Sequence, residues 1–271
     1  MFSKYLFAKT SKEYRSPIIL MYHGTVISRK QQPFEYSIDS YRFSRQLDLL
    51  KKHGWHTACI KDLKKPDELP QKTIILTFDD GFANNFEGAY LPLKERNMCA
   101  TWFIVSGCVG SYSTWLKEVN NEKMLTIEQL LEMNANGMEI GSHTVSHRDL
   151  TILNEKETHN ELTSSKTYLE KIINTPVVSF AYPYGRFGDL AANCAKKAGY
   201  SFACSVRPGL FNKNEDPFRI PRVTIFSHDS LGTFARKLIF ASNEMSWKQM
   251  IRYYNSRLIS QLKKRISFSR E

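Results

Sequence analysis

The sequence lacks a hydrophobic run of transmembrane length, and Met1–Lys9 do not contain the apolar stretch of a signal peptide. It also lacks a close Cys-x-x-Cys pair. Its five cysteines are scattered and odd in number, which favours reduced thiols over a disulfide framework or a zinc knuckle. There is no internal repeat and no glycine-rich phosphate fingerprint. We therefore expect a cytoplasmic protein, or one at the inner face of the membrane.

The composition that remains is typical of a globular protein. A chain of 271 residues with 42% hydrophobic content is long enough for one large α/β domain with a sizeable core. The formal net charge of +11 favours an anionic partner, such as a membrane surface, an acidic glycan or a nucleotide-linked sugar, although a solvated basic surface is the simpler interpretation. The basic residues are spread out and no recognition motif is present, so we expect no nucleic-acid partner.

Short apolar runs alternate with helical patterns along the chain. Strands are expected at residues 18–22, 55–60, 73–78, 100–105, 138–142, 177–181, 201–205 and 220–225. This alternation predicts parallel strands joined by helical crossovers. Polar residues recur where these strands end, at His23, Asp79, Asp80, His143 and the turn 182–185. Because a parallel barrel gathers such ends on one face, we expect a barrel rather than an open sheet.

We expect one catalytic-size domain over residues 17–240, an N-terminal extension over 1–16 and a helical tail over 241–271. The tail interleaves apolar residues such as Trp247 and Ile251 with lysines and arginines. Such a basic amphipathic helix is able to lie on an anionic membrane surface, and we hypothesise weak peripheral membrane contact. Packing of its apolar side against the barrel is the simpler alternative.

Two adjacent carboxylates, Asp79 and Asp80, follow the apolar run 73–78. Burial of carboxylates is unfavourable unless opposite charge compensates it, and a metal ion is a common partner. At the turn, one carboxylate is able to bind a cation while the other stays free as a base. Gly81 permits a tight turn and the close approach of a ligand. An isolated Asp-Asp-Gly is more often an ordinary turn, so the interpretation depends on the other motifs.

His143 and His147 form the second motif, four residues apart after the expected strand 138–142. This spacing lets both imidazoles converge, and two histidines with one carboxylate make a common ligand set for a catalytic divalent metal. The third motif is Tyr182-Pro183-Tyr184-Gly185, which also follows a strand. A turn of this kind is able to present a backbone N–H as an oxyanion donor. Each motif alone also fits a structural role.

Together the motifs resemble those of polysaccharide deacetylases of carbohydrate esterase family 4. They are Thr77–Gly81, His143-Thr144-x-x-His147 and Tyr182–Gly185, in the family's order and within roughly residues 17–226. The resemblance implies a single-domain, distorted (β/α)7 barrel. It also implies that Asp80, His143 and His147 bind one divalent metal ion, usually zinc, with cobalt, nickel or manganese as alternatives. Asp79 would be the general base, and the N–H of Tyr184 would help to hold the oxyanion.

The sequence departs from the family pattern at two places. The third motif often begins with an arginine that pairs with the catalytic aspartate, but Ala181 stands there, and Arg222 and Arg207 are candidates to replace it. The late Leu-x-His element that supplies the acid is absent. In this respect the sequence resembles the branch that deacetylates poly-N-acetylglucosamine, in which an early Tyr-His element supplies the acid. That resemblance assigns His23 as general acid, with a structural role at the strand end as the alternative.

The resemblance implies a metal-dependent carbohydrate deacetylase. Its expected substrate is an N-acetylated sugar of a cell-surface or exported polysaccharide, or a lipid- or nucleotide-linked precursor of one. A catalytically silent sugar-binding barrel is an alternative that the departure at Ala181 motivates, and a hydrolase of another small amide or ester is a second. The retained ligand set and Asp79 favour an enzyme, because a binding module needs no free base beside a metal.

Overall fold

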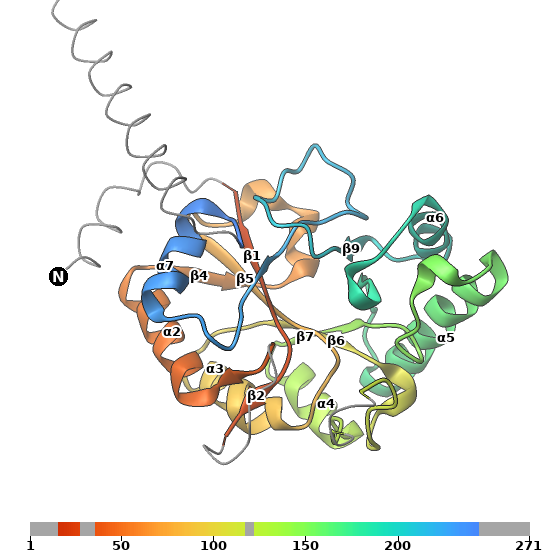
Figure 1. The fold of residues 1–271 in the computed structure, drawn as a ribbon, viewed down its shortest axis with the longest axis horizontal. Helices are drawn as coiled ribbons and strands as arrows, with labels where there is room; N and C mark the ends of the chain where they lie inside the picture. Colours follow the sequence, from red (N-terminus) through yellow and green to blue (C-terminus); the bar gives the residue numbers. More distant parts are fainter. Residues whose placement is uncertain (1–15, 28–35, 117–121, 244–271) are drawn as a thin grey trace, which may run out of the picture.

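The structure is a computed structural model that describes residues 16–27, 36–116 and 122–243 (Figure 1). A curled parallel sheet forms its centre, with strand order β10-β1-β5-β6-β7-β8-β9. The strands are β1 (Ile18–Tyr22), β4 (His56–Ala58), β5 (Thr73–Phe78), β6 (Thr101–Ile104), β7 (Glu139–Ser142), β8 (Ser179–Ala181), β9 (Phe202–Cys204) and β10 (Val223–Thr224), with a separate pair β2 (Thr25–Val26) and β3 (Ile38–Asp39). The helices are α2 (Ser40–Lys52), α3 (Leu91–Glu95), α4 (Ile127–Ala135), α5 (Glu155–Ile173), α6 (Asp189–Lys197) and α7 (Leu231–Phe240).

The segment 220–224 closes the sheet into a barrel. Ile220 bridges to Cys204 of β9, and three residues later β10 pairs with β1 through Val223 and Leu20. The predicted distorted (β/α)7 barrel is therefore confirmed. The strand expected over 220–225 is shorter than predicted, because its first residue pairs with a different neighbour from its last ones. Pro221 lies at this change of partner, where its missing N–H costs no ladder hydrogen bond.

Each strand presents alternate residues to the barrel interior. Ile19 of β1, Ile75 of β5, Phe103 of β6 and Ala181 of β8 belong to one buried cluster, whereas their chain neighbours pack in a larger cluster with the surrounding helices. Side chains two residues further along an inward row stay on the same side of the sheet. The inward rows of β1 and β5 therefore continue to His23 and Asp79 at the carboxyl edge, where the expected site lies.

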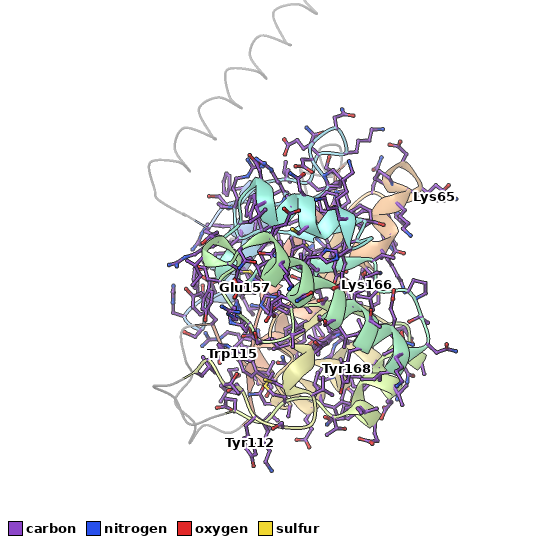
Figure 2. The ribbon with its side chains drawn as sticks, turned by 90° about the vertical axis from the view of Figure 1, so that its right-hand side faces the viewer. Lys65, Tyr112, Trp115, Glu157, Lys166 and Tyr168 are labelled. Carbon is purple, nitrogen blue, oxygen red and sulfur yellow. The ribbon has the colours of Figure 1, made fainter. Side chains whose placement is uncertain are left out.

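The helices cover the outer surface of the sheet. Figure 2 looks onto α5, from Glu157 in its first turn to Tyr168 near its last. Among the described residues, no helix combines the length and apolar character needed to span a membrane. The expected N-terminal extension and the basic tail fall almost wholly outside the described residues, so both stay predictions.

Helix α2 supplies a test of the core because Leu47 is completely buried beneath it. We expect Leu47→Ala to lower the free energy of unfolding by about 2–5 kcal/mol, since it removes buried methyl groups and leaves a cavity. Leu131→Ala is the matched control, because Leu131 lies on α4 and is 42% exposed. Urea denaturation monitored by circular dichroism measures both. Equal losses in the two variants would contradict this packing.

Candidate active site

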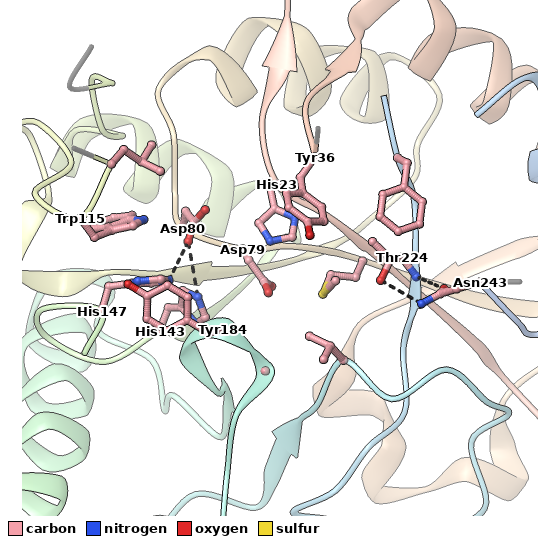
Figure 3. Close-up of a pocket in the computed structure, with 15 residues that line it drawn as sticks. His23, Tyr36, Asp79, Asp80, Trp115, His143, His147, Tyr184, Thr224 and Asn243 are labelled. Carbon is pink, nitrogen blue, oxygen red and sulfur yellow. Dashed lines mark hydrogen bonds and ion pairs between the residues drawn. The ribbon is translucent and has the colours of Figure 1, made fainter. Parts of the chain in front are cut away.

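A cavity of about 440 Å³ opens at the carboxyl edge of the barrel (Figure 3). All six residues predicted from the sequence line it, namely His23, Asp79, Asp80, His143, His147 and Tyr184. They come from the ends of β1, β5, β7 and β8, which are far apart in the sequence but adjacent or near-adjacent in the sheet. The parallel topology thus brings the three motifs into one pocket.

Asp80, His143 and His147 place one ligand atom each around a common point. The Asp80 Oδ1 atom lies 3.4 Å from Nε2 of His143 and 3.3 Å from Nε2 of His147. All three side chains are buried, and their ligand atoms lie within 4.8 Å of one another. Two imidazoles and one carboxylate in this arrangement suit a divalent ion that keeps open coordination positions.

The proton positions in this cluster also favour a cation. His143 Nδ1 lies 2.9 Å from the carbonyl oxygen of Ala181, which can only accept, so Nδ1 carries the proton. In the neutral ring, Nε2 then turns a lone pair toward Asp80. Among the described residues, Oδ1 of Asp80 has no hydrogen-bond donor. Electron-rich atoms that face each other in a buried site repel unless a positive charge lies between them, so these residues fit a metal ion.

The pKa values of the cluster also reflect burial and the short distances between its charged and polar groups. Burial raises the pKa of Asp80, but the close imidazoles of His143 and His147 outweigh this effect, and the net pKa is well below its usual range. Burial lowers the pKa of His143, yet contact with Asp80 raises it overall. For His147 the burial effect dominates and the pKa is lowered.

Unusual backbone conformations aim these residues. Asp80, Thr144, His147 and Tyr184 have φ values of 75°, 69°, 57° and 56°, in the left-handed region that non-glycine residues rarely adopt. Strain of this kind persists only where the surrounding structure imposes it, and it is concentrated at functional sites. Gly81 has a φ of 86°, and a Cβ there would lie 3.0 Å from the side chain of Ile104. The turn after β5 therefore favours glycine at this position.

Glu161 of α5 holds the loop that carries both histidines. Its Oε2 accepts the backbone N–H groups of Val145 and Ser146, each at 2.9 Å, and its Oε1 accepts the Ser146 hydroxyl at 2.5 Å. No spacing in the sequence distinguishes Glu161 from the other polar residues of this helix. Sequence reasoning therefore missed it.

Asp79 is paired with a fully buried arginine. Arg222 donates from Nη1 to Oδ1 at 2.6 Å and from Nη2 to Oδ2 at 2.8 Å. Its Nε donates to the Ser205 carbonyl, and Nη1 also donates to Thr77. Burial raises the pKa of Asp79, but the charge of Arg222 and nearby His143 outweigh this, so the net pKa is lowered.

Of the two arginines considered from the sequence, Arg222 therefore occupies the position beside the aspartate. Arg207 lies at the surface and pairs with Glu215 at 3.2 Å. Arg222 belongs to the inward row of the closing segment, between Ile220 and Thr224, and so reaches Asp79 through the barrel interior. The missing arginine at Ala181 is thus replaced in space from another part of the chain.

His23 and an aromatic rim complete the pocket. Burial lowers the pKa of His23, and the carboxylates of Asp80 and Asp79 only partly offset this. Its ring lies 5.0 Å from that of Tyr36. Trp115 stacks on His147 at 4.5 Å, and Tyr184 contacts the edge of the same ring at 4.6 Å. Sequence reasoning missed Tyr36 and Trp115, which stand in loops without a motif.

Comparison with known proteins identifies the family of this chain. The family model described as polysaccharide deacetylase matches residues 67–203. The chain belongs to the polysaccharide deacetylase family. The Bacillus subtilis protein YxkH, which carries the same family name, is 28% identical over 224 residues, 80% of this chain and 74% of that protein.

Two further similarities bear on the branch and the fold. A poly-β-1,6-N-acetyl-D-glucosamine N-deacetylase of Staphylococcus aureus is 29% identical over 202 residues, covering 70% of this chain and 68% of its own length. The crystal structure of the Bacillus cereus polysaccharide deacetylase BC0361 superposes with a TM-score of 0.72 at 28% identity, covering 82% of this chain and 69% of that one. The predicted resemblance to this family and to its poly-N-acetylglucosamine branch is confirmed.

Glu161 offers a test of the metal cluster that needs no substrate. We expect Glu161→Ala to weaken the affinity for a divalent metal by about 10- to 100-fold, the usual effect of losing a group that orients the ligands. Glu155→Ala on the same helix is the control, because Glu155 is exposed and pairs with Lys197 at the surface. Metal titration followed by isothermal calorimetry measures both. An unchanged affinity in Glu161→Ala would show that the loop holds its shape without this contact.

Proposed function

We propose that this protein is a metal-dependent de-N-acetylase that removes acetyl groups from N-acetylated glycans. The observation that carries the proposal is the pairing of two functions in one buried cavity. An Asp80–His143–His147 ligand set lies beside a separate carboxylate, Asp79, which Arg222 keeps ionised. The name of the S. aureus relative supports an N-acetylglucosamine polymer as the substrate class.

Asp80, His143 and His147 would hold the metal ion, and the ligand set favours zinc. Cobalt, nickel and manganese accept the same donor types. When bound, the ion supplies Lewis-acid chemistry, which lowers the pKa of water and polarises the acetamide carbonyl. The Ala181 carbonyl fixes the His143 ring for this role, because it holds the proton on the ring nitrogen that points away from the cluster.

Asp79 is positioned to be the general base. Its lowered pKa keeps the carboxylate ionised at neutral pH, and each oxygen that accepts from Arg222 retains a further lone pair. It takes one proton from the water whose oxygen forms the new bond to the acetamide carbon. Arg222 holds both carboxylate oxygens, so the direction in which Asp79 accepts the proton is fixed.

His23 and the Tyr184 turn are proposed to act on the leaving amine and on the carbonyl oxygen. In the proposal, His23 donates a proton to the amine as the carbon–nitrogen bond breaks, which yields a free amino sugar and acetate. Burial lowers the pKa of His23 overall, and its neighbours Asp79 and Asp80 act in the opposite direction, toward the protonated ring that this step requires. The backbone N–H of Tyr184 is proposed to stabilise the negative charge on the carbonyl oxygen. Tyr36 and Trp115 offer ring faces and edges against which a pyranose is able to pack.

The proposal is tested by acetate release from N-acetylglucosamine oligomers, together with metal content. We expect Asp79→Asn and His23→Ala to keep about the metal content of the unaltered protein and to lose activity by about 10²- to 10⁴-fold, because each removes a proton-transfer group. His143→Ala is expected to lose both metal and activity. Metal is measured by plasma mass spectrometry on purified protein.

Two results would contradict the assignments. Near-normal turnover in Asp79→Asn would exclude Asp79 as the base. Loss of metal from His23→Ala would make His23 a ligand or a scaffold residue. A metal-loaded protein that releases no acetate from any N-acetylated glycan would leave the silent sugar-binding barrel as the better reading.

Arg222 gives a pH-dependent prediction. The ionised form of Asp79 accepts the proton, so kcat/KM falls as the pH drops through the pKa of Asp79. Arg222 lowers that pKa, and we therefore expect Arg222→Met to move the acidic limb of kcat/KM upward by about 1–3 pH units. Arg222→Lys, which keeps the charge but loses the bidentate fork, is expected to shift it less.

The same variants report on stability. Removal of Arg222 leaves a buried carboxylate unpaired, at a cost of about 3–5 kcal/mol, so thermal unfolding identifies the variants that remain folded at the assay temperature. An acidic limb that stays in place in both folded variants would show that Arg222 does not set the pKa of the base.

A further inference from the structure

A second cavity, of about 390 Å³, lies where α2, α7 and the loop after β10 meet. Helices α2 and α7 stand side by side in Figure 1, on the side of the barrel away from α5. Arg42, Arg45 and Tyr41 of α2 line the cavity, and His228 lines it from the loop. None of these residues belongs to the pocket that holds the metal-ligand cluster.

The arginines of this region differ from the others that the structure describes. Elsewhere, Arg96, Arg148, Arg186, Arg207, Arg219 and Arg222 each pair with a carboxylate. Within the described ranges, the three arginines without such a partner are Arg42, Arg45 and Arg236, and all three lie on α2 or α7. Two of these three arginines, Arg42 and Arg45, line the second cavity.

Contacts with the backbone hold one of the two arginines that line this cavity. Arg42 donates from Nη1 to the backbone carbonyls of Ser227 and Asp229, which fixes its guanidinium against the loop. The guanidinium of Arg45 lies 5.9 Å from the centre of the Tyr41 ring. Asp39 is the acidic residue of the lining, and its carboxylate is engaged as the cap of α2, accepting the Arg42 backbone N–H at 2.9 Å.

One pair of stacked rings connects this cavity with the catalytic pocket. His228 lines the second cavity, Phe226 lines the first, and their rings lie 5.4 Å apart with planes only 8° from parallel. The Phe226 ring also lies 5.8 Å from that of Tyr36, which borders His23. The two cavities therefore border the same pair of rings, which places Arg42 and Arg45 on this side of the catalytic pocket.

We propose that this second cavity binds an anionic group, a phosphate or a carboxylate, carried by the same glycan whose acetamide enters the catalytic pocket. The inference rests on the proposed deacetylase function and specifies its substrate class. Guanidinium groups recognise both anions by charge-assisted, bidentate hydrogen bonds. The site would select glycans that are charged next to the N-acetylated sugar over neutral ones.

The test compares three N-acetylglucosamine oligomers of equal length: a neutral one, one with a terminal phosphate and one with a terminal uronic acid. We expect kcat/KM for acetate release to be about tenfold higher for at least one charged oligomer, the effect of a single charge-assisted hydrogen bond. Which of the two is preferred identifies the anion. The preference should shrink as salt is raised, since the cavity is open to solvent.

Arg45→Ala and the double variant Arg45→Ala/His228→Ala are expected to abolish the preference, measured as the ratio of kcat/KM for charged and neutral oligomers. Both residues are exposed, so the fold should survive, and thermal unfolding checks this. Lys171→Ala is the control, because it removes one positive charge from the exposed end of α5. That control should keep both the preference and the rate on the neutral oligomer.

Equal kcat/KM for all three oligomers, or a preference that persists in the double variant, would overturn the proposal. Binding is read separately by NMR, from the Nε–Hε signals of the arginine side chains during titration with each oligomer. One outcome is that the arginine signals shift with a charged oligomer, that this shift is lost in Arg45→Ala, and that no acetate is released. This result would uphold the anion site and refute the deacetylase function. Acetate release without any such response or preference would do the reverse.

Discussion

The site depends on how two neighbouring carboxylates are neutralised in a buried place. Asp79 and Asp80 are 3% and 4% exposed, and two adjacent negative charges at that depth would be strongly unfavourable alone. In the structure, the two carboxylates contact different partners, which compensate their charges. Asp79 continues the inward row of β5 and meets Arg222, whereas Asp80 adopts a left-handed conformation and turns toward His143 and His147. The difference in partners creates a difference in chemistry.

The two carboxylates therefore need different environments, and irregular loops surround them. The charge of a carboxylate bound in a fork by arginine is already compensated, while a carboxylate oxygen that faces two imidazoles without a hydrogen-bond donor suits a cation. To achieve the second environment, the loop after β7 places Thr144 and His147 in strained conformations. Glu161 and the turn at Gly107 brace this loop, and a Cβ at Gly107 would lie 2.6 Å from the Val145 carbonyl. The strain is thus supported by ordinary packing from α5 and the end of β6.

The sequence predicts the parts of this arrangement that are local in the chain. Alternating strands and helices predict the barrel, and polar residues after strands predict which side chains line the pocket. Contacts between residues that are far apart in the sequence could not be predicted, because they depend on how the strands and helices pack. Glu161 sits among other polar residues of α5, and Trp115 and Tyr36 lie in loops with no periodicity, so nothing in their neighbourhood marks them. The sequence does favour Arg222 as the partner of the aspartate. Arg222 stands between Ile220 and Thr224 on the inward row of a short apolar run, where an unpaired arginine would be unfavourable. Arg207 stands outside that run.

The departure at Ala181 and the presence of Arg222 are best understood as one change. Ala181 is completely buried in the interior cluster, where it lies with Phe103 and Cys204. The guanidinium of Arg222 lies 5.5 Å from the Phe103 ring and donates to the carbonyl of Ser205, the residue after Cys204. The positive charge therefore enters the same interior region from the closing segment rather than from β8. A small residue at 181 leaves that space free, while its carbonyl oxygen still orients His143. An arginine side chain at both positions would place two like charges in one buried space beside a single partner carboxylate. On this argument the missing arginine is evidence for a relocated ion pair, and it does not favour a silent barrel.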